Sequence, residues 1–154
     1  PSGEENVFKN YDGNGGVAQH NLIGFHNWGG ILLEGTGNPV DDWQILGNEI
    51  RANGWGNPVF DGIGVNIVGG TTTIQRNLIA ANRSSGIDVA NAAGTLAIDG
   101  NTITGNAAAA GPEQFGVDVR GGTATTTISH NVITANTGSG VVVAGAVAAQ
   151  ITQN

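Results

Sequence analysis

A short pattern of hydrophobic and polar positions recurs along the whole chain. The signature Asn-x-Ile-x-x-Asn begins at Asn48, Asn77, Asn101 and Asn131, and a looser copy begins at Asn21. The last residue of the sequence falls on the first position of a further copy. The leading asparagines are therefore spaced by 27, 29, 24, 30 and 23 residues. Near-equal intervals of this length are typical of solenoid architectures.

Two further elements accompany each copy of the signature. An apolar residue, isoleucine in all copies but the first, stands three positions before the leading asparagine. After the second asparagine comes a glycine followed by two apolar positions with one spacer: Gly30-Ile31-x-Leu33, Gly62-Ile63-x-Val65, Gly86-Ile87-x-Val89, Gly116-Val117-x-Val119 and Gly140-Val141-x-Val143. Alternation of this kind, rich in β-branched residues, predicts three very short strands in each unit.

Strands of three to five residues cannot form a stable sheet within one unit. They can if successive units stack as coils, so that each strand pairs in parallel with its equivalent about 4.8 Å away. The inward isoleucines and valines then form continuous columns. We therefore predict an all-β fold, a parallel β-solenoid over residues 20–154 with five full coils, preceded by an irregular N-terminal part-coil over residues 1–19.

The repeated asparagines have a structural role in this arrangement. Each side chain is expected to bond its neighbour in the stack and the backbone of the turn, since asparagine tolerates the left-handed conformation that sharp bends require. The predicted ladder residues are Asn48, Asn77, Asn101 and Asn131 at the first position and Asn53, Asn82, Asn106 and Asn136 at the second.

This unit resembles the right-handed parallel β-helix repeat of the pectin-lyase-like superfamily, which also occurs in bacterial surface proteins. The resemblance covers residues 18–154. It implies a right-handed helix whose first sheet is built from the Gly-Ile-x-Val strands. It also implies that any enzymatic activity would be lysis, hydrolysis or epimerisation of acidic polysaccharides, with working residues pointing outward from that sheet and from the loop before it.

Unequal loop lengths indicate where a site could lie. Between the second asparagine and the glycine the sequence advances nine positions in one repeat (53 to 62) and ten in another (106 to 116), against four in two others (82 to 86 and 136 to 140). Insertions of this kind in a solenoid often mark the binding face. Trp55, Phe60 and Phe115 in these loops are suited to stacking against sugar rings. The alternative is that these aromatic side chains fold back over their own loops.

Asp88, Asp118 and Arg120 occupy outward positions of the first sheet between these loops. The two aspartates hold the same position in successive coils, which places their carboxylates about one strand spacing apart. Such a pair requires a cation or an arginine nearby, so Ca²⁺ binding and pairing with Arg120 are both candidates. The resemblance to polysaccharide lyases would make Arg120 the base beside a Ca²⁺-bound substrate. The simplest interpretation is that both acids are solvated surface groups.

Composition narrows the possible partners. Twelve acidic residues against five basic ones give a net charge of -7, which is unfavourable for nucleic-acid binding. There is no cysteine, so a disulfide scaffold and a cysteine-ligated zinc site are excluded. No apolar run is long enough to predict a membrane-spanning helix. The lack of cysteine and near-lack of lysine favour an extracellular or cell-surface location.

Few residues in the chain carry recognisable chemistry, which favours a non-catalytic role. The paired aspartates and Gly-His-Gly motif of polygalacturonases are missing, as is the Asp-Pro-His signature of alginate epimerases. We expect a structural or adhesive module of a secreted or cell-surface protein. Because the chain stops on the first position of a repeat, we expect bare strand edges that recruit further coils or a second copy into a fibre. The alternative is a polysaccharide-binding protein or a pectate-lyase-like enzyme.

Overall fold

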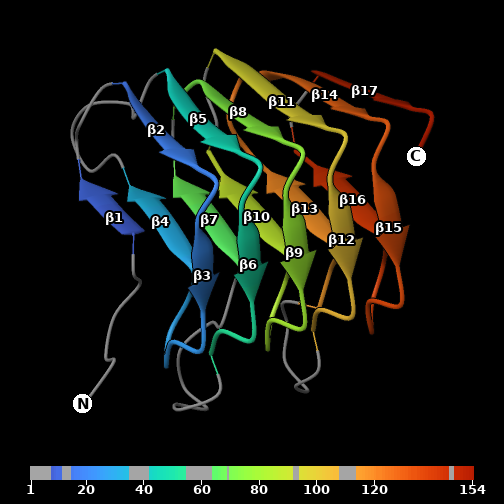
Figure 1. Cartoon of the computed structure of the whole chain (residues 1–154). Coiled ribbons are helices and arrows are strands. Elements are labelled where there is room, and N and C mark those ends of the chain that lie inside the picture. Colours follow the sequence, from blue (N-terminus) through green and yellow to red (C-terminus); the bar gives the residue numbers. More distant parts are fainter. Residues whose placement is uncertain are drawn as a thin grey trace.

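The computed structural model describes residues 8–11, 15–34, 42–54, 64–68, 70–91, 94–107, 114–145 and 148–154. These residues form short strands joined by turns, without a helix among them. The strands stack side by side into a three-faced solenoid, with the N-terminal coils at one end and the C-terminal coils at the other (Figure 1). The predicted all-β parallel solenoid is confirmed.

Each face of the solenoid is one parallel sheet. The first sheet contains β1 (Phe8–Tyr11), β4 (Ile31–Glu34), β7 (Val65–Val68), β10 (Ile87–Ala90), β13 (Val117–Arg120) and β16 (Val141–Ala144). The second contains β2 (Gly16–Gln19), β5 (Trp43–Leu46), β8 (Thr72–Gln75), β11 (Thr95–Asp99), β14 (Thr125–Ser129) and β17 (Ala148–Thr152). The third contains β3 (Leu22–Gly24), β6 (Glu49–Arg51), β9 (Leu78–Ala80), β12 (Thr102–Thr104) and β15 (Val132–Thr134).

Residues 1–19, for which the sequence predicts an irregular part-coil, contribute two strands to the stack. Strand β1 pairs in parallel with β4, and β2 pairs with β5. The described residues of this segment therefore pair within the first and second sheets. A domain boundary at residue 19 stays a prediction.

The core consists of columns of branched aliphatic side chains that run along the solenoid axis. In the second sheet, Ile45, Ile74, Ile98 and Ile128 follow one another in register, and all four are fully buried. Full burial of one such side chain stabilises a fold by roughly 1.5–3 kcal/mol. The column then reaches the end of the stack at Ile151, which is 51% exposed.

One predicted strand register is wrong by two residues. Gly64 rather than Gly62 stands at the glycine position, and Val65 and Ile67 are the buried residues of β7, in register with Ile87 and Val89. The predicted inward residue Ile63 lies outside the described residues. A shift of two residues keeps every side chain on the same face of a strand, so the alternation in the sequence fits both registers equally.

The two asparagine ladders form as predicted. In the first ladder, the Asn101 side-chain nitrogen donates to Asn131 Oδ1 at 2.9 Å and to the Ile74 carbonyl at 2.9 Å. Its Oδ1 accepts from the backbone and side-chain nitrogens of Asn77 at 3.0 and 2.9 Å. The amide thus makes four hydrogen bonds across adjacent coils, and a buried polar group is stable only when satisfied in this way. In the second ladder the same pattern links Asn53, Asn82, Asn106 and Asn136. In the first coil His26 takes the position of the ladder asparagine, and its backbone nitrogen donates to Asn53 Oδ1.

Two threonines in the core have hydroxyl groups without a hydrogen-bond partner among the described residues. Thr72 and Thr126 lie in the inward column of the second sheet that also holds Trp43 and Leu96, and both are buried. Because the hydroxyl loses its bonds to water without replacement, we expect Thr126→Val to raise the free energy of unfolding by about 1 kcal/mol. Chemical denaturation measures this. Thr127→Val, on the outward side of the same strand, is the control and should stay within about 0.5 kcal/mol of the wild type; a less stable Thr126→Val variant would contradict the prediction.

Candidate functional site

Asp88 and Asp118 lie side by side on the outer face of the first sheet. They are register partners on β10 and β13, as predicted, and alternate with the buried inward residues of those strands. Both are nevertheless shielded from solvent, with exposed fractions of 9% and 0%. The simplest interpretation of these two acids as solvated surface groups is therefore wrong.

The Asp118 carboxylate forms an ion pair with Arg120, two positions further along the same strand. Burial raises the pKa of Asp118, and hydrogen bonding and charge attraction from Arg120 partly offset that rise. Pairing with an arginine was one of the two arrangements expected for this acid. The Arg120 side chain is itself 44% exposed, so one end of the pair contacts water.

The raised pKa of Asp118 makes a pH-dependent prediction. An acid whose pKa is higher in the folded than in the unfolded state destabilises the fold at pH values above its ordinary pKa of 3.8. We therefore expect Asp118→Asn to be more stable than the wild type at neutral pH, and the gain to vanish below about pH 3.8, where the acid is protonated in both states. Urea denaturation at a series of pH values measures this. A gain that persists unchanged at the lowest pH would contradict it.

Phe115 is half-buried and contacts the same group of residues. The Arg120 guanidinium lies 5.3 Å from the centroid of the Phe115 ring. The backbone nitrogen of Phe115 donates to Ser85 Oγ at 3.3 Å. A cation above an aromatic ring within about 6 Å is attracted to it, so Arg120 already occupies one side of the ring. The other two aromatics predicted to stack on sugars, Trp55 and Phe60, lie outside the described residues. A carbohydrate platform stays a prediction.

The paired aspartates do not by themselves complete a metal site. Ca²⁺ takes about six to eight oxygen ligands. Within the described residues, no group of three or more histidine, aspartate or glutamate side chains is placed to hold a metal ion. Asp88 and Asp118 could supply only part of the ligand set, and Asp118 is already neutralised by Arg120.

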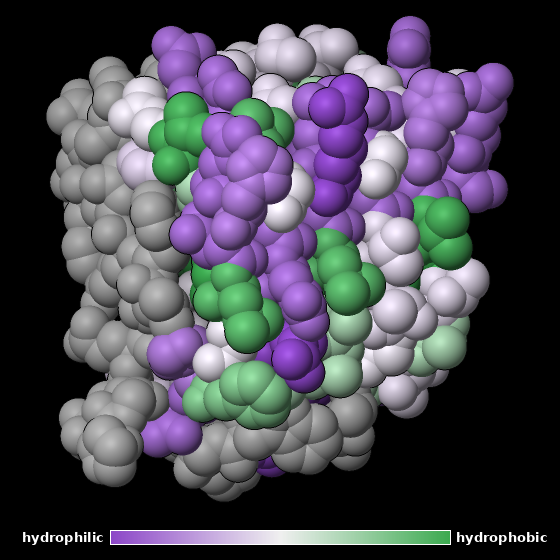
Figure 2. Space-filling model, viewed as in Figure 1, coloured by the Kyte–Doolittle hydropathy of each residue, from purple (hydrophilic) through white to green (hydrophobic). Residues whose placement is uncertain are grey.

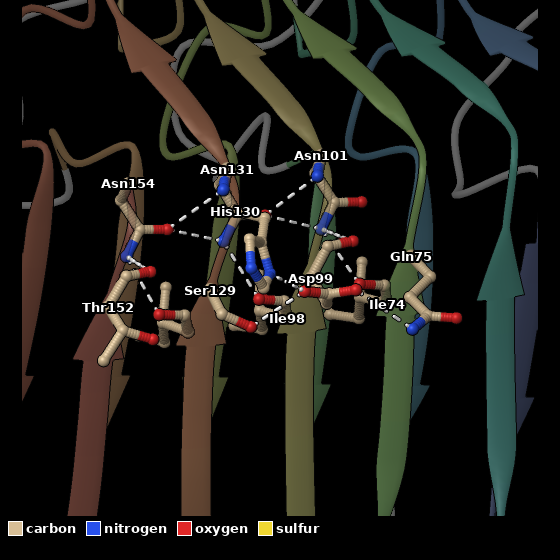
Figure 3. A network of polar contacts seen from close by, with 11 residues as sticks. Ile74, Gln75, Ile98, Asp99, Asn101, Ser129, His130, Asn131, Thr152 and Asn154 are labelled. Atoms are coloured by element: carbon tan, nitrogen blue, oxygen red, sulfur yellow. Dashed lines mark hydrogen bonds and ion pairs between the residues drawn. The ribbon is translucent and has the colours of Figure 1, made fainter.

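A second polar cluster lies at the corner between the second and third sheets (Figure 3). Asp99 Oδ1 accepts from Ser129 Oγ at 2.8 Å and lies 2.8 Å from His130 Nδ1, while Asp99 Oδ2 accepts from Gln75 Nε2 at 3.2 Å. The cluster therefore joins three successive coils, through β8, β11 and β14 and the turn after it. One carboxylate receives three donors, which satisfies most of its capacity to accept hydrogen bonds.

The contact with Asp99 changes the titration of both partners. Hydrogen bonds from His130 and Ser129 lower the pKa of Asp99. The hydrogen bond to Asp99 raises the pKa of His130, and a hydrogen bond with Gln153 adds to the rise. The repeat contains a signal for this contact: Asp99 stands two positions before one ladder asparagine, and His130 stands one position before the next.

The outer face of the third sheet does not present a continuous apolar patch. Figure 2 shows hydrophobic side chains separated by hydrophilic ones on this face. Among the described residues of the third sheet and the turn after β3, the exposed large apolar residues are Leu22, Phe25, Leu78 and Val132. Arg51 lies 5.1 Å from the ring centroid of Phe25. Single exposed apolar residues of this kind are normal on a protein surface. Over the described residues, no helix is long and apolar enough to span a membrane.

Comparison with known families agrees with this architecture. A family model described as "Right handed beta helix region" matches residues 4–154. The chain therefore belongs to the right-handed β-helix family, as the repeat resemblance indicated. No curated protein and no solved structure matches the chain.

Proposed function

We propose that the chain is a structural or adhesive module of a secreted or cell-surface protein, and that another β-helix coil covers its C-terminal end. That coil belongs to a second copy of the chain. The observation that carries the proposal is the loss of burial at this end. Ile128 is fully buried, whereas its register partner Ile151 is 51% exposed.

The end of the stack also presents unpaired backbone edges. Strands β15, β16 and β17 are the outermost members of the three sheets, and all five residues of β17 are exposed. The edge of a sheet is a template for pairing with another strand. Here three parallel edges and the end of an apolar column coincide, so an added coil would gain both hydrogen bonds and apolar burial.

Sedimentation velocity of the chain over a range of concentrations tests this proposal. We expect concentration-dependent association that Ile151→Lys abolishes, since a charge at the end of the core column cannot be buried without a partner. Leu78→Lys is the control, because Leu78 is also exposed, at 37%, but lies on the outer face of the third sheet in the middle of the stack. A chain that stays monomeric at every concentration would contradict the proposal.

A polysaccharide-binding protein or a pectate-lyase-like enzyme is the second candidate. The observation that favours it is the grouping of Asp118, Arg120 and Phe115 on the first sheet. Binding is better supported than lysis, because a base must be unprotonated and an arginine in an ion pair remains charged. Arg120 is therefore better suited to holding an acidic group of a glycan than to removing a proton.

A glycan array, together with an absorbance assay for unsaturated product on pectate and alginate with and without Ca²⁺, tests this candidate. Glycan binding that the Asp88→Ala/Asp118→Ala double variant changes would support it. If the wild type and the double variant are equally inert towards sugar and Ca²⁺, this surface has no role in polysaccharide recognition.

A further inference from the structure

A row of turn residues follows the corner between the second and third sheets, with one residue from each coil. Its members share a left-handed backbone conformation and directly follow strands that pair in register: His20, Gly47, Arg76, Gly100 and His130. Basic side chains therefore alternate with glycines along this corner. Two basic residues on either side of a glycine are about 10 Å apart at the backbone, since each coil adds one strand spacing.

Gly100 has a basic side chain on each side. A Cβ at Gly100 would lie 3.9 Å from Arg76 Cγ, so the stem of Arg76 runs beside the glycine. On the other side, the His130 imidazole reaches back to the coil of Gly100, where its Nδ1 lies 2.8 Å from Asp99 Oδ1 (Figure 3). Arg76, Gly100 and His130 are all exposed. The surface over Gly100 is therefore open to solvent and lies between two basic groups.

The Arg76 guanidinium differs from those of the other arginines in having its charge unused. Arg51 and Arg120 form ion pairs with acids on their own strands, and Arg83 donates to a backbone carbonyl. Within the part of the chain that the structure describes, the Arg76 side chain has no such partner. All of its donors are therefore available to a ligand, and a guanidinium is well suited to binding an oxyanion.

We propose that Arg76 and His130 form a binding site over Gly100 for a tetrahedral oxyanion, a sulfate or phosphate group. Because Nδ1 of His130 faces Asp99, the protonated ring presents its Nε2–H as a second donor. The hydrogen bond to Asp99 raises the pKa of His130 and so favours this form. A tetrahedral group has oxygens directed towards both donors at once, whereas a carboxylate has its two oxygens on one edge and faces only one of them.

Asp99 is the acid beside the site, and its carboxylate is turned towards the protein. Its two oxygens face Gln75 on β8, Ser129 on β14 and the imidazole of His130 (Figure 3). Asp99 thus orients His130, while Arg76 on the far side of Gly100 supplies the charge that remains for an anion.

The turn at Gly47 provides an internal comparison. A Cβ there would lie 3.0 Å from His20 Cδ2 and 3.2 Å from His20 Nε2, so the imidazole of His20 itself occupies the space over that glycine. Leu46 stands at the strand position that Asp99 holds two coils later, so His20 has no acid at the position that orients His130. His20→Gln is therefore the matched control.

Titration of the dilute chain with sodium sulfate, followed by NMR at constant ionic strength near pH 5.5, tests the site. We expect saturable shifts of the Arg76 Nε–H, the Gly100 amide and the His130 ring, and no saturable shift with acetate. Arg76→Gln and His130→Gln should each weaken binding about two- to fivefold, the size expected for an exposed charged contact. Binding by the wild type should weaken by a similar factor near pH 8.5, where His130 loses its proton. His20→Gln should bind sulfate as the wild type does.

Dextran sulfate, with unmodified dextran as its control, distinguishes the two sources of the anion. Tighter binding per sulfate group than inorganic sulfate would identify a polymer that carries sulfate groups as the ligand, and equal or weaker binding would identify the free anion. Unsaturable shifts, equal binding of acetate, or unchanged affinity in either Arg76→Gln or His130→Gln would overturn the site. The result does not depend on whether copies of the chain associate.

Discussion

Replacing Asn101 by alanine should lower the free energy of unfolding by about 3–6 kcal/mol, because several buried groups would lose their partners at once. The backbone and side-chain nitrogens of Asn77 would lose their acceptor, and the Ile74 carbonyl would lose a donor. Each orphaned buried group costs roughly 1–3 kcal/mol. A loss of this size is a large fraction of the 5–15 kcal/mol or so that stabilises an ordinary domain.

Asn21→Ala is the control for this prediction. Asn21 is the first described member of the same ladder and is exposed, and its side chain donates to Asn48 Oδ1 at 3.1 Å. Its replacement should cost about 1 kcal/mol, the value of one hydrogen bond. Urea denaturation of both variants, followed by circular dichroism, gives the comparison. Equal and small losses in the two variants would show that the ladder contributes little to stability.

Gly86→Ala should destabilise the fold by about 2–4 kcal/mol, although its backbone does not require glycine. A Cβ at this position would lie 2.7 Å from the Gly116 carbonyl oxygen, 2.7 Å from Ile103 Cγ2 and 3.0 Å from Asn106 Nδ2. The first and third of these atoms belong to the sheet and to the second ladder, so neither can move without disturbing hydrogen bonds. Glycine is present here because successive coils approach too closely for any side chain.

Gly140→Ala is the matched control at the end of the stack. Gly140 has the same repeat position, but a Cβ there would meet only Ile133 Cγ2, at an ordinary contact distance of 3.6 Å. Alanine should be neutral or stabilising by up to about 1 kcal/mol, because it reduces the entropy of the unfolded chain. Thermal denaturation separates the two variants. A Gly86→Ala protein as stable as Gly140→Ala would mean that the coils are spaced more widely than described.

Most of the fold could be predicted from the sequence because the same repeat unit, with the same strand and turn signals, occurs several times along the chain. The Asn-x-Ile-x-x-Asn signature fixes two turns and an inward residue, and the repeats reinforce one another along the chain. The register of β7 could not be predicted, because Gly62 and Gly64 are both glycines followed by an apolar residue. The register of β7 is set by its pairing with β10 in the neighbouring coil, which places Gly64 at the glycine position.

The candidate site was harder to predict than the fold. The register of Asp88 and Asp118 follows from the repeat, but their burial does not follow from it. The contact between Asp99 and His130 joins residues 31 positions apart. It requires the two coils to be aligned residue by residue.

We propose that two copies of the chain pair end to end through the edges of β15, β16 and β17. Electron cryomicroscopy of the chain, at concentrations where it associates, tests this most directly. We expect particles lengthened along the solenoid axis, in which β-strand spacing of about 4.8 Å continues across the junction between copies and Ile151 is buried at the junction. Side-by-side association, or particles no longer than a single unit at every concentration, would contradict it.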